Sequence, residues 1–226
     1  MGNNSVIRCE NISFQYTEGS TLFSDVSLSI NPGGFYLVRG PSGSGKSSFL
    51  RLMNRLEEPS QGTLYFKGIP FSEMTAPELR RQVLYIQQTP IVTDGSVKDN
   101  LLMPFTFKNN RTLPLPDDSH LRGVLDEFSM EMIPLDKQAR NLSVGQQQRL
   151  CLIRGLLLSP SVILLDEPTS SLDDESSLIV ENMAESLCLN AGKTIIMISH
   201  RGFRPHTIKP TIIEVKDGRL TVLPQE

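Results

Sequence analysis

Short apolar runs alternate with helical patterns along this chain. Residues 6–14 and 21–30 alternate apolar and polar positions, which predicts two strands that each bury one face. Four other runs are almost wholly apolar, as buried parallel strands are, and they cover residues 35–38, 83–86, 162–165 and 194–199. Apolar positions at helical spacing predict three long helices over residues 46–56, 143–158 and 174–189. Strands that alternate with helices indicate an α/β fold with a largely parallel sheet.

The pattern changes between residues 89 and 139, where prolines break the chain into short helices and loops. We therefore expect a helical lobe of about residues 89–155, inserted into a core that carries an N-terminal antiparallel β-subdomain. The core and the β-subdomain would comprise about residues 1–88 and 156–226. No segment repeats, so we expect a single domain over residues 1–226.

The composition excludes some classes of function. The net charge of −3 gives no basic surplus, so nucleic acid is not expected as a partner. The three cysteines are widely spaced and form no C-x-x-C pair, which favours free thiols in a reducing compartment. No run approaches the roughly eighteen apolar residues of a membrane span, and the N-terminus lacks a secretion signal. We expect a cytoplasmic protein that reaches a membrane only through a partner.

A glycine-rich loop follows the run 35–38 and precedes the first long helix. Its sequence fits G-x4-G-K-[ST], in which backbone N–H groups and the positive end of a helix surround phosphate oxygens. Lys46 would neutralise phosphate charge, and the Ser47 hydroxyl would bind Mg²⁺. The nucleotide-binding candidates in this loop are Gly40, Pro41, Ser42, Gly43, Ser44, Gly45, Lys46, Ser47 and Ser48.

Two further segments carry candidate chemistry. Asp166 and Glu167 end an apolar strand, where one carboxylate can hold Mg²⁺ and the other can polarise an attacking water. Residues 142–146 read Leu-Ser-Val-Gly-Gln and fit a capping box, with Ser143 as N-cap and Gln146 three residues further on. Gly145 leaves the N-terminus of that helix bare, which suits a phosphate at close approach. A capped helix without a ligand is the alternative.

These segments and their order resemble the ATP-binding cassette (ABC) family over nearly the whole chain, from residue 16 to residue 218. The resemblance implies a P-loop NTPase with a RecA-like core, and ATP and Mg²⁺ as its cofactors. It implies a set of catalytic residues, namely Lys46, Gln88, Glu167 and His200. It implies that Mg²⁺ is bound by Ser47, Gln88 and Asp166. It further implies that adenine stacks on Tyr16, and that the ATP of a partner cassette is met by Ser143, Gly145, Gln146 and Asp173.

Two of these positions have alternatives, and a neighbouring position departs from the family. Gln87 lies next to Gln88, and a slip in register would exchange them. Tyr16 also fits a core tyrosine. Val144 stands where the family has a glycine, and its β-branched side chain would crowd an approaching nucleotide, so we expect slower turnover.

The resemblance also implies partners. A homodimer of ATPase subunits would close around two Mg-ATP and drive integral membrane permease subunits on separate chains, from the cytoplasmic face of the cell membrane. Residues 88–90, 94–101 and 104–105 are similar to those of subunits of metal (iron) export systems. The alternative is a soluble ABC-type ATPase in DNA repair or translation. Such proteins carry a long coiled coil or two cassettes, and the chain has neither, which favours the transporter subunit.

Overall fold

A computed structural model of the chain describes residues 5–16, 21–199 and 203–223. An antiparallel sheet in the order β2-β1-β4-β5 forms its N-terminal part. The four strands are β1 (Ile7–Gln15), β2 (Thr21–Ile30), β4 (Gln61–Phe66) and β5 (Ile69–Pro70). Buried and exposed residues alternate along β2, as its sequence predicts. The expected antiparallel β-subdomain is therefore confirmed.

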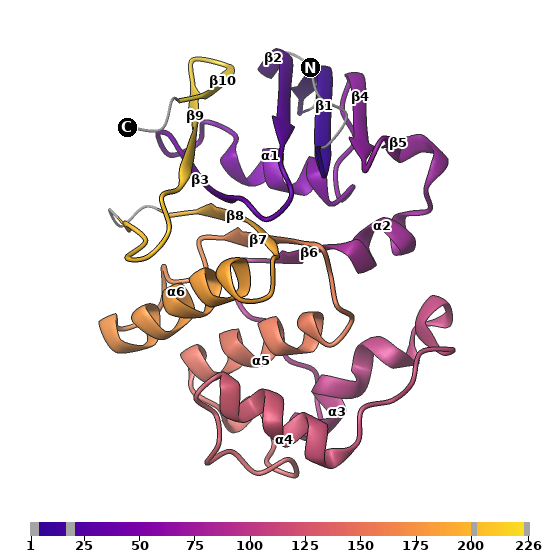
Figure 1. Ribbon diagram of the computed structural model, residues 1–226, viewed down its shortest axis with the longest axis vertical. Coiled ribbons are helices and arrows are strands. Elements are labelled where there is room, and N and C mark those ends of the chain that lie inside the picture. The colour runs from indigo at the N-terminus through magenta and orange to yellow at the C-terminus, as the bar shows by residue number, and fades with distance from the viewer. Residues whose placement is uncertain (1–4, 17–20, 200–202, 224–226) are drawn as a thin grey trace.

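A second sheet runs through the middle of the molecule, in the order β10-β9-β3-β8-β7-β6 (Figure 1). Its strands are β3 (Phe35–Arg39), β6 (Val83–Ile86), β7 (Val162–Asp166), β8 (Thr194–Ile198), β9 (Thr211–Lys216) and β10 (Arg219–Val222). All pairings are parallel except that of β10 with β9. Every residue of β7 and β8 is buried, as expected of parallel strands covered on both faces.

Helix α1 (Lys46–Met53) lies between the two sheets, whereas α5 (Val144–Leu156) and α6 (Asp174–Leu189) cover the other face of the parallel sheet (Figure 1). Two hydrophobic clusters follow from this layering. One cluster joins α1 to both sheets through residues such as Phe49 and Leu50. The other joins the far face of the parallel sheet to α5, α6 and the helical region. The α/β fold with a RecA-like core is confirmed.

The predicted helical lobe contains short helices beside α5. They are α3 (Val97–Leu102), α4 (Asp118–Glu127) and 3₁₀ turns at Met103–Thr106, Lys108–Asn110 and Ala139–Asn141. Ser96 and Asp99 form a capping box at the start of α3. Buried Asn100 ties the preceding loop to this helix, because its amide donates to the carbonyls of Thr93 and Ser96 at 3.1 and 3.0 Å. The short helices are thus stabilised by helix caps as well as by packing in the second hydrophobic cluster.

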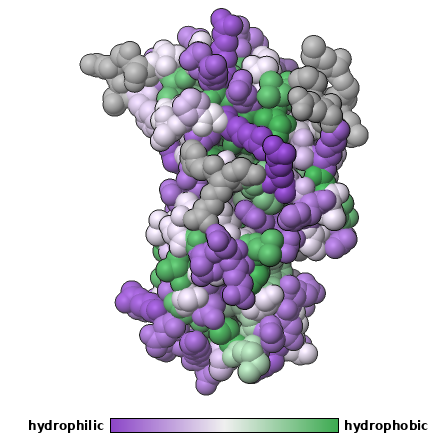
Figure 2. Space-filling view, turned by 90° about the vertical axis from the view of Figure 1, so that its left-hand side faces the viewer, coloured by the Kyte–Doolittle hydropathy of each residue, from purple (hydrophilic) through white to green (hydrophobic). Residues whose placement is uncertain are grey.

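The face of the molecule drawn in Figure 2 carries hydrophilic residues with small hydrophobic patches between them. Throughout the described parts of the chain, no helix has both the length and the apolar character needed to cross a membrane. All three cysteines are free and buried.

Helix α1 ends at Met53, three residues earlier than the apolar pattern predicts. Arg55 adopts a left-handed conformation, with φ of 57°. The Leu56 N–H donates to the Arg51 carbonyl at 2.8 Å, and the Arg55 N–H donates to the Leu52 carbonyl at 3.0 Å. This pair of bonds is a Schellman motif. The sequence does not predict this helix end, because an arginine occupies the position where glycine is usual.

Helix α2 (Ala76–Gln82) was not predicted from the apolar pattern. It follows a 3₁₀ turn at Phe71–Glu73 and starts with a capping box between Thr75 and Glu78, with Pro77 in the first turn. Thr-x-x-Glu with a proline at the first turn is a helix-start signal. The signal was present in the sequence, but the helix is too short for a clear apolar periodicity.

Burial of α1 between the sheets makes Phe49 a sensitive position. Its side chain is fully buried, whereas Phe107 is 54% exposed. We expect Phe49→Ala to lower the free energy of unfolding by about 3–5 kcal/mol, because the truncation leaves a cavity. Denaturant titration measures this loss, with Phe107→Ala as the matched control within about 0.5 kcal/mol of the parent. Equal losses in both variants would contradict the layering.

Candidate nucleotide-binding site

The phosphate loop connects the end of β3 to the start of α1. Gly43 has φ of 76°, and nothing lies within 4 Å of where a Cβ would stand, so the loop is open at this point. At Gly40 a Cβ would lie 2.1 Å from the Val215 carbonyl oxygen, which excludes any larger residue. These glycines therefore allow the loop to curl tightly and leave its backbone accessible to an anion.

Lys46 is almost completely buried at the first turn of α1. Its Nζ donates to the carbonyl oxygens of Gly40 at 3.1 Å and Pro41 at 2.8 Å. Burial lowers the pKa of Lys46, while the charges of Glu167 and Asp166 act in the opposite direction. The ammonium is thus held inside the loop by neutral carbonyls, and a phosphate oxygen would offer it a stronger, charged acceptor.

A pocket of about 280 Å³ brings four parts of the chain together. Its lining comes from the phosphate loop and α1, from the end of β1, from the start of β2 and from the end of β7, and comprises Tyr16, Leu22, Ser42, Gly43, Gly45, Lys46, Ser47, Ser48 and Glu167. Within the described residues, the buried Ser44 hydroxyl has no hydrogen-bond partner, so the loop holds a polar group ready for a ligand. A larger cavity of about 880 Å³ lies around Arg39 and Lys209 and contains none of the motif residues. The smaller pocket is therefore the candidate nucleotide site.

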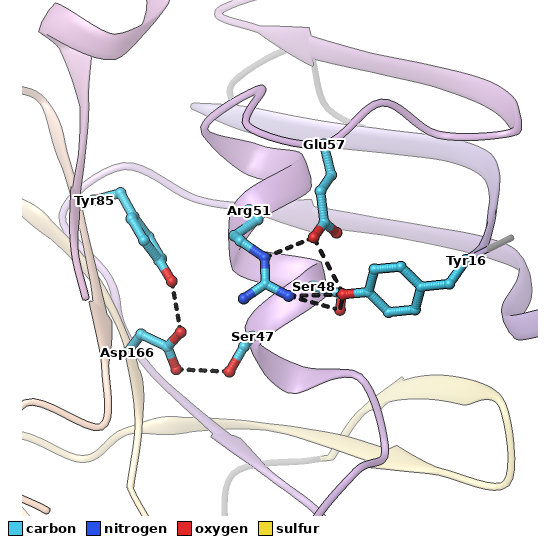
Figure 3. Close-up of polar contacts among 7 residues, drawn as sticks. All are labelled: Tyr16, Ser47, Ser48, Arg51, Glu57, Tyr85 and Asp166. Atoms are coloured by element: carbon cyan, nitrogen blue, oxygen red, sulfur yellow. Dashed lines mark hydrogen bonds and ion pairs between the residues drawn. The ribbon is translucent and has the colours of Figure 1, made fainter. Parts of the chain in front are cut away.

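Asp166 joins β7 to α1. The Ser47 hydroxyl donates to its Oδ1 at 2.9 Å, and the Tyr85 hydroxyl donates to its Oδ2 at 2.6 Å (Figure 3). The second bond and burial both raise the pKa of Tyr85, burial being the larger cause. No signal in the sequence pointed to Tyr85.

The donor set around Asp166 fits magnesium. A hydroxyl and a carboxylate are oxygen ligands, which this hard cation prefers. In the described ranges, no group of three or more His, Cys, Asp or Glu side chains could hold a metal ion by itself. In ATPases none is needed, because Mg²⁺ is usually held by one or two protein groups together with phosphates and water.

Glu167 and Gln88 face each other across the carboxyl ends of β7 and β6. Gln88 Nε2 lies 3.5 Å from Glu167 Oε2 and donates to Ser170 Oγ at 3.1 Å. Glu167 has φ of 49°, a left-handed conformation that costs a non-glycine residue about 1–3 kcal/mol.

The neighbouring Gln87 turns away from this group. Its own amide donates to the Thr89 carbonyl at 2.9 Å, and its carbonyl accepts from Gln148 Nε2 of α5 at 3.3 Å. The geometry therefore favours Gln88 over Gln87 as the candidate that faces Glu167. Gln87 links that segment to the helical lobe.

Tyr16 is not a core tyrosine, since it is 43% exposed and its ring meets Phe14 edge-on. Its hydroxyl makes a short hydrogen bond with Ser48 and donates to Glu57 at 3.1 Å (Figure 3). Arg51 Nη2 in turn donates to the Tyr16 oxygen at 2.7 Å. These hydrogen bonds fix the aromatic ring against α1 at the edge of the pocket, in a position suited to stacking on a nucleotide base.

Arg51 and Glu57 were not predicted as site residues. Arg51 Nε donates to Glu57 Oε1 at 2.7 Å. Burial disfavours the charge of Arg51, but the hydrogen bonds with Glu57 and Tyr16 outweigh it and raise its pKa. Arg51 therefore stays charged and supports the position of Tyr16.

The segment 142–146 lies outside the pocket, at the N-terminus of α5. Ser143 and Gln146 form the expected capping box, with the Gln146 N–H donating to Ser143 Oγ at 3.3 Å. Val144 is 48% exposed, whereas Gly145 is buried against α6. A Cβ on Gly145 would lie 2.9 Å from Ser176 Oγ, so packing within the chain also requires this glycine.

Asp173 caps the same part of α6 that Gly145 contacts. Its carboxylate accepts from the Ser176 N–H at 2.7 Å, and this hydrogen bond lowers the pKa of Asp173. The N-terminus of α5 and the segment that starts α6 thus form one packed unit. His200, predicted as the residue at the γ-phosphate, lies outside the described residues.

A parallel sheet that carries a phosphate loop, a magnesium-type carboxylate and an inserted helical lobe defines a P-loop nucleoside triphosphatase. Residues 23–170 match the ABC transporter family. The chain belongs to that family and is an ATP-binding, ATP-hydrolysing member of it.

Individual relatives agree with this assignment. The chain is 32% identical over 198 residues to the probable iron export ATP-binding protein FetA of Escherichia coli (strain K12), covering 88% of this chain and 86% of the relative. It is 32% identical over 219 residues to ABC transporter I family member 17 of Arabidopsis thaliana, covering 97% and 82%. The ATP-binding cassette MJ0796, solved as a dimer in a post-hydrolysis state with ADP and Pi, matches with a TM-score of 0.80 at 26% identity, over 95% and 96% of the two chains.

Lys46 provides the direct test of the pocket. We expect Lys46→Ala to weaken ATP binding by about 100-fold or more, because charge-assisted hydrogen bonds are worth roughly 1.5–3 kcal/mol each. Isothermal titration or a fluorescent nucleotide measures the affinity. Lys216→Ala, at an exposed position of β9, is the matched control and should bind ATP as the parent does. Retained affinity in Lys46→Ala would move the nucleotide elsewhere.

Proposed function

We propose that this chain is the ATPase subunit of a transporter and that two copies close head-to-tail around two Mg-ATP. The main support for the proposal is that the pocket of one chain lacks the residues of segment 142–146. The pocket holds the phosphate loop, Tyr16 and Glu167, while Ser143 begins a helix that does not contribute to it. The N–H groups of the first turn and the positive end of α5 suit a phosphate supplied by another chain.

Within each pocket, the residues divide the work. Lys46 and the loop amides bind the phosphates, and Tyr16 stacks on adenine. Ser47 and Asp166 would hold Mg²⁺, which supplies charge neutralisation at the phosphates, and Gln88 would complete its surroundings. Glu167 accepts a proton from the attacking water, a role typically worth about 10²–10⁴-fold in rate. His200 comes shortly after β8 in the sequence and, as the family resemblance implies, would contact the γ-phosphate.

Asp173, Gly145 and Gln146 would transmit closure between the two copies. Asp173 and Gly145 both pack on the first turn of α6, so a partner's ATP at α5 would act on both. Gln146 closes the capping box and thereby sets the orientation of Ser143. Val144 is the exposed residue of this group, and its side chain would narrow the approach of the nucleotide.

Transport is the proposed use of this ATPase. Separate integral membrane subunits would receive the movement of the helical lobe at the cytoplasmic face of the membrane. Metal export, with iron as the candidate, is supported by the name of the Escherichia coli relative, which matches most of both chains. It is further supported by the similarity of residues 88–90, 94–101 and 104–105 to subunits of metal export systems.

Glu167→Gln tests the dimer. The variant should bind ATP but not hydrolyse it, so ATP bound between two chains will hold them together. Size-exclusion chromatography in ATP and Mg²⁺ should then show a dimer, and the double variant Glu167→Gln, Lys46→Ala should stay a monomer. A monomeric Glu167→Gln protein at saturating ATP would refute the head-to-tail arrangement.

A further inference from the structure

Tyr85 lies on the same face of the parallel sheet as Asp166. In β6, Val83 and Tyr85 pack on the side of α1, whereas Leu84 and Ile86 pack on the side of the helical lobe. Tyr85 pairs with Leu164 of β7, and Asp166 follows two residues later. Since side chains alternate along a strand, Leu164 and Asp166 share a face. The diagonal from Tyr85 to Asp166 is within reach of an aromatic side chain.

The two carboxylate oxygens of Asp166 accept hydrogen bonds from different residues. Oδ2 accepts from Tyr85 at 2.6 Å, and Oδ1 accepts from Ser47 at 2.9 Å (Figure 3). Only 5% of Asp166 is exposed, so solvent contributes little to its orientation. With Oδ2 occupied by the phenol, the carboxylate cannot rotate freely, and Oδ1 stays directed at the phosphate-loop serine.

The backbone of β6 is itself fixed at both ends. At its start, Asn54 of the α1 C-terminus donates a short hydrogen bond to the Val83 carbonyl. Just past its end, Gln148 of α5 donates to the Gln87 carbonyl at 3.3 Å. Tyr85 therefore projects from a strand held against both α1 and α5, which gives the phenol a defined place from which to orient Asp166.

We propose that Tyr85 is a positioning residue for the magnesium site and sets the orientation of Asp166 toward the cation. This inference rests on the proposed role of Asp166. Hydrogen-bond partners behind a metal ligand typically contribute about 10–100-fold in metal affinity. Tyr85 is not among the residues that line the nucleotide pocket, so its removal should lower metal affinity without changing the contacts of the nucleotide.

Mn²⁺ in place of Mg²⁺ gives a readout independent of turnover. In Tyr85→Phe, electron paramagnetic resonance should show Mn²⁺ binding about tenfold more weakly to the complex with a non-hydrolysable ATP analogue. Binding of the same analogue in EDTA should be unchanged, because Tyr85 does not line the nucleotide pocket. Tyr65→Phe, on β4 beside Arg8, is the matched control and should leave Mn²⁺ affinity unchanged.

Asp166→Asn separates the two levels of the proposal. If this variant loses Mn²⁺ and Tyr85→Phe does not, the positioning role of Tyr85 is wrong and the magnesium assignment stands. If Asp166→Asn binds Mn²⁺ as the parent does, the magnesium assignment fails and the inference about Tyr85 fails with it. A loss of metal-free analogue binding in Tyr85→Phe would also overturn the proposal, because it would indicate a general disturbance of the pocket.

Discussion

The burial of α1 between two sheets is the constraint on which the candidate site depends. Phe49 and Leu50 fix the helix to both layers, which leaves its polar residues facing the pocket. From that face, Ser47 reaches Asp166 of β7, and Ser48 and Arg51 reach Tyr16 past the end of β1. The phosphate loop, the Tyr16 ring and the Asp166 carboxylate are thus positioned by one helix, and a shift of α1 would displace all three together.

The sequence predicted the parts of the site that depend on local chemistry. The glycine-rich loop before Lys46 and the two acidic residues at the end of β7 are recognisable because each motif is made of residues adjacent in the sequence. Tyr85, Arg51 and Glu57 gave no such signal, since their roles arise from contacts between segments far apart in the chain. The end of α1 was misplaced for a related reason, because a left-handed arginine terminates the helix where the apolar pattern continues.

Gly145 shows how one residue serves two constraints. From the sequence, its missing side chain suggested room for a phosphate. In the structure, the position of a Cβ is directed at Ser176, and Val144 is the residue on the surface. The glycine therefore joins α5 to the start of α6, where Asp173 forms the cap. Ser143 and Asp173 are therefore coupled through the packing of α5 on α6. An ATP bound at α5 by another chain would shift the segment after β7 as well.

The central claim is that Ser143 of one chain completes the pocket of another. Mixing two inactive variants tests it most directly, with Glu167→Gln carrying an intact Ser143 and Ser143→Arg carrying an intact Glu167. In a mixed dimer one composite site is whole, so the account predicts ATP hydrolysis well above the sum of the separate rates. A mixture that hydrolyses ATP only at that sum would contradict the claim and place the complete site within a single chain.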